Sequence, residues 1–263
     1  MAKVLAITNQ KGGVGKTTTS VNLAASLAAT KRRILMIDLD PQGNATMGCG
    51  IDKSEVETSA YDLLTKKASF EEVVVKSETG GFDVIPSNGD LVAAEVELLN
   101  EIGREHRLRI ALNGVRENYD FILIDCPPSL NMLTVNALSV SDGVIIPMQC
   151  EYYSLEGLAA LMNTIEQIRE TINPNLSISG ILRTMYDPRN SLTRDVSSEL
   201  EEYFKELVYS VAIPRNVRLA EAPSHGMPVL YYDKGSKGAI AYLALAGEIV
   251  RKTKSERREA LSA

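Results

Sequence analysis

The chain has 263 residues, of which 44% are hydrophobic and 24% charged, and its formal net charge is −6. This balance is typical of a globular protein and excludes a disordered or membrane-embedded chain, while the net charge excludes a surface that is basic all over. The cysteines Cys49, Cys126 and Cys150 are widely spaced and odd in number, which favours buried thiols over a disulfide framework or a metal site. With only two histidines, neither a zinc site nor a histidine-based triad is expected.

Seven short apolar runs along the chain are typical of buried, mostly parallel strands. They cover residues 4–8, 34–37, 82–85, 121–124, 144–147, 178–182 and 208–213. Helix-length stretches lie between most of them, at 17–29, 91–102, 155–171 and 193–207, and Ser154 is the expected N-cap of the third. The alternation predicts an α/β fold with a doubly wound, mostly parallel sheet flanked by helices and with ligands at the carboxyl ends of the strands.

No repeat, low-complexity tract or Pro/Gly linker divides the sequence, so residues 1–263 are expected to form a single domain. After a helical pattern at 239–250, residues from about 251 to 263 form a short basic tail that we expect to be solvated and frayed. No apolar run is long enough for a membrane span, and the N-terminus lacks a signal-peptide pattern. We therefore expect a cytoplasmic protein.

A glycine-rich loop directly follows the first predicted strand and opens the first predicted helix, which is the context that a phosphate-binding loop requires. Its glycines let the backbone amides point inward, Lys16 places a charge on the β/γ-phosphates, and Thr17 offers a hydroxyl to Mg²⁺. The spacing departs from the common pattern, because Gln10 replaces the first glycine and Lys11 adds a lysine at the start. The residues expected to bind nucleotide here are Lys11, Gly12, Gly13, Val14, Gly15, Lys16, Thr17 and Thr18.

Two further motifs end predicted strands in acids at the edge that faces the phosphate loop. The run 34–37 is followed by Asp38 and Asp40, where Asp40 can orient or deprotonate an attacking water and Asp38 can support the Mg²⁺ shell or the neighbouring loop. The run 121–124 ends in Asp125, a Walker B pattern, and this carboxylate should hold Mg²⁺ through a water. The expected metal-site residues are therefore Thr17, Asp38 and Asp125.

These motifs resemble the deviant Walker A ATPases of the ParA/MinD superfamily, and the ParA branch, in its short Soj-like form, fits best. The resemblance extends from residues 9–11 through 148–153 to 232–233. It implies that ATP assembles a sandwich homodimer, in which Lys11 acts on the partner's nucleotide and Asp40 serves hydrolysis. It also implies that Pro214 and Asn216 flank the adenine, although periodicity alone predicts only a loop at 214–226.

The resemblance further implies a nucleoid-associated protein whose ATP-bound dimer binds double-stranded DNA without sequence preference. A ParB-type partner would stimulate its slow hydrolysis and so release it. Basic residues of the C-terminal third are the natural DNA contacts, but acids lie among them, so the linear sequence does not demonstrate a patch. We expect the contacts at Arg189, Arg215 and Arg218, which lie in loop-like segments.

Three alternatives stay open. A MinD-like membrane-cycling ATPase would need a C-terminal amphipathic helix, whereas the residues after Val250 are basic and nearly lack bulky apolar side chains, so no membrane partner is expected. An ATPase that positions a protein cargo on the nucleoid is a second alternative, which the sequence distinguishes poorly from a ParA protein. The third alternative is a metabolic or redox P-loop enzyme, such as a small-molecule ligase or a relative of the nitrogenase iron protein. The iron–sulfur cluster of the latter needs cysteines in motif contexts that this sequence lacks.

Overall fold

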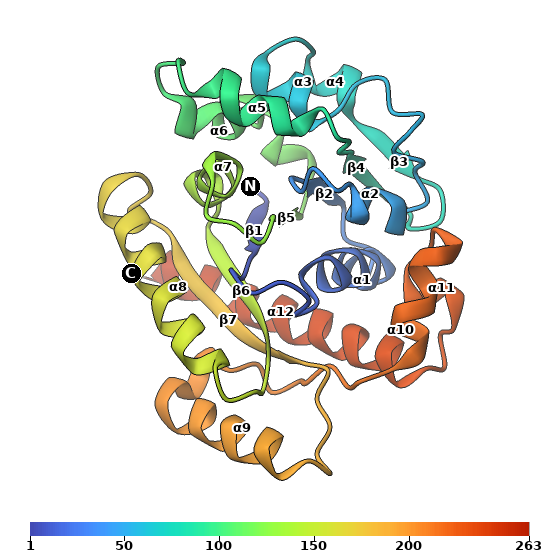
Figure 1. The fold of residues 1–263 in the computed structure, drawn as a ribbon, viewed down its shortest axis with the longest axis vertical. Coiled ribbons are helices and arrows are strands. Elements are labelled where there is room, and N and C mark those ends of the chain that lie inside the picture. Colours follow the sequence, from blue (N-terminus) through green and yellow to red (C-terminus); the bar gives the residue numbers. More distant parts are fainter. Residues whose placement is uncertain (263) are drawn as a thin grey trace.

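The computed structural model describes residues 1–262. Its centre is a seven-stranded sheet with the strand order β3-β4-β2-β5-β1-β6-β7, in which only β3 is antiparallel to its neighbour (Figure 1). From β1 the chain extends the sheet first to one side, through β2 to β5, and then to the other, through β6 and β7, which confirms the doubly wound fold. The strands are β1 (Lys3–Ile7), β2 (Ile34–Asp38), β3 (Val75–Ser77), β4 (Phe82–Ile85), β5 (Phe121–Asp125), β6 (Gly143–Gln149) and β7 (Ser177–Thr184).

Helices cover both faces of the sheet (Figure 1). Successive strand residues point to opposite sides, so each strand contributes side chains to the core on both faces. Leu5 and Ile7 pack in the core cluster that holds side chains of α1 and α12, whereas Val4 and Ala6 pack in the cluster of α7 and α8. The helices are α1 (Lys16–Ala29), α2 (Asn44–Gly48), α3 (Ala60–Thr65), α4 (Phe70–Val73), α5 (Leu91–Leu98), α6 (Arg107–Ala111), α7 (Met132–Val140), α8 (Ser154–Thr171), α9 (Ser191–Phe204), α10 (Val217–Glu221), α11 (Val229–Tyr232) and α12 (Lys237–Ser262). Short 3₁₀ turns cover Arg104–His106, Arg116–Asn118, Lys205–Leu207 and Ala222–His225.

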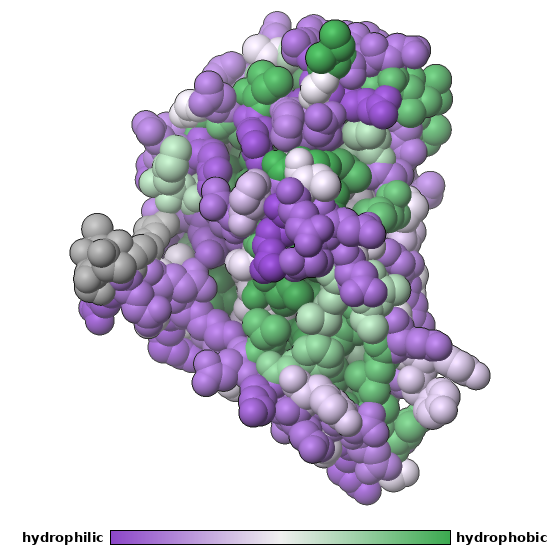
Figure 2. All heavy atoms as spheres, turned by 90° about the vertical axis from the view of Figure 1, so that its left-hand side faces the viewer, coloured by the Kyte–Doolittle hydropathy of each residue, from purple (hydrophilic) through white to green (hydrophobic). Residues whose placement is uncertain are grey.

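A few apolar side chains of α8 reach its solvent side, which is otherwise polar, with Glu156, Asn163 and Glu170 exposed. Figure 2 shows the side of the molecule to which α8 contributes, where hydrophobic side chains gather in a band bordered by hydrophilic ones. Along this helix Ala159 and Ala160 are exposed, while Leu155 and Met162 are half-buried. The helix expected at 155–171 is thus confirmed as α8, which begins one residue earlier.

The prediction of a strand at 208–213 is wrong, because side chains satisfy much of the backbone that a sheet ladder would have bonded. The Glu248 carboxylate, buried on α12, accepts hydrogen bonds from the amides of Ser210 (2.9 Å) and Val211 (3.2 Å). The buried Arg183 guanidinium donates to the carbonyls of Tyr209 (3.0 Å) and Ser210 (3.3 Å). The other six runs form β1, β2, β4, β5, β6 and β7, and the short antiparallel β3 was not predicted.

Several helix boundaries also differ from the sequence prediction. Ser154 is the first residue of α8 and Tyr153 is its N-cap, and α5 ends at Leu98 rather than at 102. Residues 251–262 continue α12, so the prediction of a frayed tail is wrong for them, and residue 263 lies outside the described residues. The segment 214–226 contains α10 and a 3₁₀ turn. The three cysteines are free and buried, which confirms the prediction of packed thiols.

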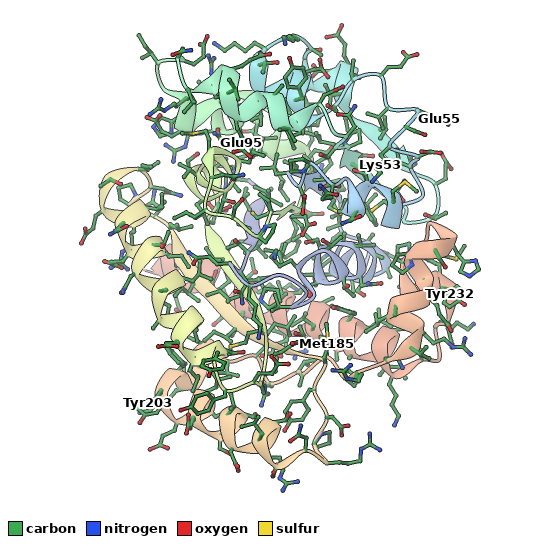
Figure 3. The ribbon with its side chains drawn as sticks, in the orientation of Figure 1. Lys53, Glu55, Glu95, Met185, Tyr203 and Tyr232 are labelled. Atoms are coloured by element: carbon green, nitrogen blue, oxygen red, sulfur yellow. The ribbon has the colours of Figure 1, made fainter. Side chains whose placement is uncertain are left out.

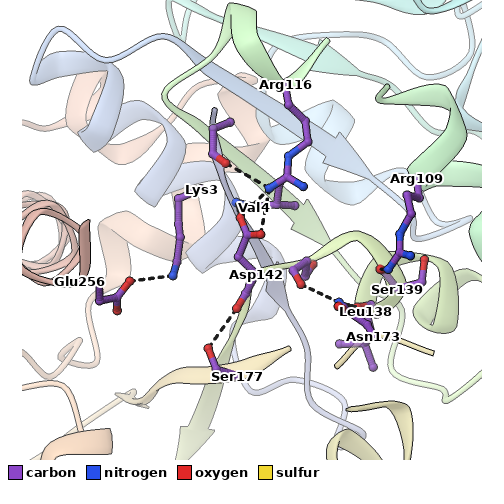
Figure 4. Close-up of polar contacts among 12 residues, drawn as sticks. Lys3, Val4, Arg109, Arg116, Leu138, Ser139, Asp142, Asn173, Ser177 and Glu256 are labelled. Atoms are coloured by element: carbon purple, nitrogen blue, oxygen red, sulfur yellow. Dashed lines mark hydrogen bonds and ion pairs between the residues drawn. The ribbon is translucent and has the colours of Figure 1, made fainter. Parts of the chain in front are cut away.

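Asp142 ties together the amino ends of three strands through its carboxylate and its backbone carbonyl (Figure 4). The Asp142 carboxylate accepts hydrogen bonds from the Val4 amide (2.7 Å) and, through both oxygens, from Nη2 of Arg116 (2.9 and 2.7 Å). Ser177, at the start of β7, donates its hydroxyl to the Asp142 carbonyl (3.0 Å). This cluster fixes β1, β6 and β7 at the edge opposite their carboxyl ends.

We expect Asp142→Ala to lower the free energy of unfolding by about 2–3 kcal/mol, because the Val4 amide loses its partner and the Arg116 guanidinium keeps only the Ala2 carbonyl (3.2 Å). Chemical denaturation measures the change. The control is Glu170→Ala, an exposed α8 carboxylate without a partner among the described residues, which should stay within about 0.5 kcal/mol of the parent. Equal stability of the two variants would contradict the role of Asp142.

Candidate nucleotide-binding site

The loop between β1 and α1 has the backbone of a phosphate cradle. Gly13 (φ 72°) and Gly15 (φ 87°) adopt left-handed conformations that favour glycine, and Gly15 is the N-cap of α1, where free amides and the helix dipole attract anions. The Thr184 hydroxyl at the end of β7 donates to the Val14 carbonyl (2.8 Å), and the Asn9 side chain accepts from the Lys11 amide (3.0 Å). The loop is thus anchored at both ends.

Lys16 lies inside this loop. The residue as a whole is 7% exposed, and its Nζ donates a hydrogen bond to the Lys11 carbonyl (3.2 Å). Burial lowers the pKa of the Lys16 ammonium, while the negative charges of Asp125 and Asp40 oppose that shift. The two carboxylates therefore lie close enough to Lys16 to act on its charge, as the sequence motifs predicted.

Asp125 joins the end of β5 to the first turns of α1. Its two oxygens accept hydrogen bonds from the Thr17 hydroxyl (2.9 Å) and the Ser20 hydroxyl (2.8 Å). Complete burial raises the pKa of Asp125, and the neighbouring charge of Asp38 raises it further. A hydroxyl beside a carboxylate supplies the oxygen ligands that Mg²⁺ prefers, so Thr17 and Asp125 fit this metal. Sequence reasoning missed Ser20, which has no motif signal beyond lying one helical turn from Lys16.

Asp38 is occupied by its own loop. One oxygen accepts from the Asp40 amide (3.1 Å), and the other accepts from both the amide (2.8 Å) and the hydroxyl (2.7 Å) of Thr46. The Thr46 hydroxyl in turn accepts from the Ser87 amide (2.9 Å). Of the two roles predicted for Asp38, this geometry favours shaping of the 38–46 loop, and its role at the metal stays a prediction.

Asp40 is only partly buried, and its carboxylate accepts a hydrogen bond from the Gln42 amide (2.9 Å). Its carbonyl accepts from the Ser87 hydroxyl (2.8 Å), which fixes the loop after β2. The side chain thus lies at the rim of the site on a fixed backbone.

Lys11 points to a different partner from Lys16. Its Nζ forms an ion pair with Oε2 of Glu151 (2.7 Å), and the two side chains are 44% and 52% exposed. Glu151 follows β6 and was not predicted as a site residue. The pair joins the outer side of the phosphate loop to the residues that precede α8.

A pocket of about 180 Å³ lies beside the loop. Its lining includes Gly15, Thr18, Pro214 and Asn216, so both residues expected at the adenine border the same space as the phosphate loop. Asn216 is the N-cap of α10, and its Oδ1 accepts from the Arg218 amide (3.1 Å). Its Nδ2 has no partner within residues 1–262 and remains a donor for a ligand.

The three arginines expected to contact DNA have different surroundings. Arg189 has an 89% exposed side chain that is paired with Asp187 (2.7 Å). Arg218 lies in α10 rather than in a loop and is held by the carboxylates of Glu221 (2.8 Å) and Asp233 (3.3 Å). Arg215 is exposed, and its side chain has no ion pair or hydrogen bond in the described part of the chain. Among the other basic residues of the C-terminal third, Arg183 is buried and bonds the backbone of 209–210.

A parallel α/β sheet with this loop, helix and buried acid defines the class of P-loop nucleotide-binding proteins. A family model described as an AAA domain matches residues 2–178. The sporulation initiation inhibitor protein Soj of Bacillus subtilis is 53% identical over 95% of this chain and 98% of its own. The chromosome partitioning protein ParA of Caulobacter vibrioides is 50% identical over 98% of this chain and 97% of its own. The chain belongs to the ParA family of the ParA/MinD superfamily.

Solved structures agree with the fold. A cobyrinic acid a,c-diamide synthase from Mycobacterium smegmatis, solved with ADP and magnesium, is 37% identical, has a TM-score of 0.85 and covers 97% of both chains. MinD of Pyrococcus horikoshii, solved with Mg-ADP, has a TM-score of 0.78 over 95% of this chain and 96% of its own, and at 23% identity it supports the fold alone. Among residues 1–262, no helix combines the length and apolarity needed to cross a bilayer.

We expect Gly43→Ala to destabilise the protein by about 1–3 kcal/mol, because Gly43 has φ 61° and a Cβ there would lie 2.8 Å from the Ser87 carbonyl oxygen. Thermal unfolding measures the effect. The matched control is Gly157→Ala in α8, where a Cβ meets nothing within 4 Å and the melting temperature should hold or rise. If Gly43→Ala melted no lower than the control, the loop would not need glycine.

Proposed function

We propose that this protein is an ATP-dependent DNA-partitioning switch. ATP joins two copies into a sandwich dimer that binds DNA without sequence preference, and hydrolysis separates them again. The observation that carries the proposal is the position of Lys11. Its ammonium lies at the exposed rim beside Glu151, whereas Lys16 already occupies the interior of the same loop. A second lysine on the outer side suits the neutralisation of phosphates bound by another subunit.

Each residue of the site has a distinct part in the proposed reaction. ATP and Mg²⁺ are the cofactors, and bound Mg²⁺ neutralises charge that develops on the phosphates. Thr17 and Asp125 hold the metal, Asp125 through a water, and Lys16 holds the phosphates. Asp40, at the rim, orients or deprotonates the attacking water. Pro214 and Asn216 contact the adenine.

DNA binding follows from avidity in this proposal. Two weak phosphate-contacting surfaces that ATP joins bind DNA more tightly than either alone, and hydrolysis releases both. The relative named chromosome partitioning protein ParA supports a role in partitioning. In the proposed cycle, a ParB-type partner stimulates hydrolysis on the nucleoid. Arg189 and Arg215 are the more accessible phosphate contacts, because Arg218 is held by two carboxylates.

A second candidate is a small-molecule ligase, because the M. smegmatis structure named as a cobyrinic acid a,c-diamide synthase is 37% identical over 97% of this chain. The identities to Soj and ParA are higher, at 53% and 50%, and they favour partitioning. Purified protein with ATP and random-sequence duplex DNA separates the two candidates, since a ligase has no need for ATP-dependent DNA binding.

Lys16→Ala should abolish ATP binding, since the phosphates lose their buried counter-charge. Lys11→Ala should keep ATP binding in the monomer but lose the ATP-dependent dimer. Fluorescent-nucleotide titration and light scattering with ATP and Mg²⁺ measure the two effects. If Lys11→Ala dimerised as well as the parent, Lys11 would have no role between subunits.

Asp40→Ala should retain ATP binding but hydrolyse it at least about 100-fold more slowly, since no carboxylate orients the water. The dimer should then stay on DNA. Binding to random-sequence duplex DNA is compared without nucleotide, with ADP and with ATP plus Mg²⁺. Parent-like turnover by the variant would refute the role of Asp40, and absence of DNA binding in every state would refute the switch.

A further inference from the structure

A small pocket of about 160 Å³ lies at the N-terminus of α9, outside the phosphate loop. Asn190, Thr193 and Arg215 line it, and so does Met185, which Figure 3 shows between the phosphate loop and α9. Met185 and Arg215 also line the pocket expected to hold the adenine. The two pockets thus share a wall.

Three donors that line this pocket lack partners within residues 1–262. Thr193 is 8% exposed as a residue, and its hydroxyl makes no hydrogen bond to any residue of 1–262, so it is free to donate to a ligand. Asn190 caps α9 by accepting from the Leu192 amide (3.0 Å), and its Nδ2 is unpaired in the described chain. The Arg215 guanidinium is likewise unpaired there. All three can donate, and α9 spans 14 residues, so its dipole favours an anion at this end.

The charges around the pocket also favour an anion. Its two carboxylates are already held, Glu151 by Lys11 (2.7 Å) and Asp187 by Arg189 (2.7 Å). Arg215 is the only cation among the described residues that line the pocket, and its charge also acts on Asp187. Lys11 and Arg189 do not line the pocket, but counted with Arg215 they outnumber the two carboxylates by one charge. A cation would have to compete with Lys11 or Arg189, whereas an anion meets unused donors.

We propose that this pocket binds a phosphate group, with the Thr193 hydroxyl, the Asn190 amide and the Arg215 guanidinium as its donors. A backbone phosphate of DNA is the source that the charges and the neighbouring Arg189 favour, and this source rests on the proposed function. Free phosphate has the same chemistry and is the other source. Met185 and Arg215 border both pockets. An adenine in one pocket and a DNA phosphate in the other would therefore contact the same two residues, which links DNA binding to nucleotide binding.

The first experiment tests the pocket without DNA. The full chain is saturated with ADP and Mg²⁺, so that the phosphate loop is filled, and is titrated with inorganic phosphate while amide NMR signals are followed. The amides of Leu192 and Thr193 should shift, and Thr193→Val should weaken this binding about 5- to 10-fold. The matched control is Thr171→Val, which removes an exposed hydroxyl at the end of α8 and should leave the titration unchanged.

The second experiment measures binding to random-sequence duplex DNA with ATP at several salt concentrations. Thr193→Val should lower the affinity about 3- to 10-fold with an unchanged salt slope, since no charge is lost. Arg215→Gln should lower both the affinity and the slope, the slope by about one. Thermal unfolding checks the fold, and Thr193→Val removes no side-chain hydrogen bond among residues 1–262.

The outcomes separate the two proposals. Amide shifts together with weaker DNA binding support a DNA phosphate as the ligand. Amide shifts with unchanged DNA binding, or in a protein that binds no DNA at all, support the pocket and assign it to free phosphate. No amide shift and unchanged DNA binding in Thr193→Val would overturn the pocket, whatever the fate of the switch.

Discussion

The site depends on the burial of two carboxylates side by side. Asp38 and Asp125 end the neighbouring strands β2 and β5, face each other in the pairing register, and are fully buried. Such a pair is costly unless hydrogen-bond donors surround it, and burial raises the pKa of both acids. Donors from α1 and from the 38–46 loop surround the pair. The positions of α1 and of that loop thus follow from the need to supply hydrogen-bond donors to the Asp38 and Asp125 carboxylates.

The sequence predicted the fold and the phosphate loop well, because both depend on local patterns. A buried parallel strand followed by glycines and a helix leaves few alternatives, and Lys16, Thr17 and Asp125 lie where these patterns placed them. The same local pattern, a short apolar run, predicted a strand at 208–213. That segment is not a strand, because Glu248 and Arg183, distant in sequence, satisfy its backbone.

The remaining parts of the site could not be predicted, because they depend on contacts between distant segments. Glu151 becomes a site residue only when the fold brings it to Lys11, 140 positions away. Ser20 and Thr46 bind buried acids through hydroxyls that carry no sequence signal. Arg218 was predicted in a loop, but a short helix and two acids surround it. Periodicity reports which side of an element packs and does not report which polar group it meets.

The segment 208–213 also has a consequence for how copies of the protein can associate. It lies along β7, the last strand of the sheet, and its Tyr209 and Ile213 amides donate to the carbonyls of Ile181 (3.0 Å) and Arg183 (2.8 Å). At the opposite end, β3 has only three residues. Long unpaired strands allow chains to add to one another's sheets, and short or covered strands prevent it. Filaments of this protein, if they form on DNA, would therefore grow through contacts between side chains and not by extension of the sheet.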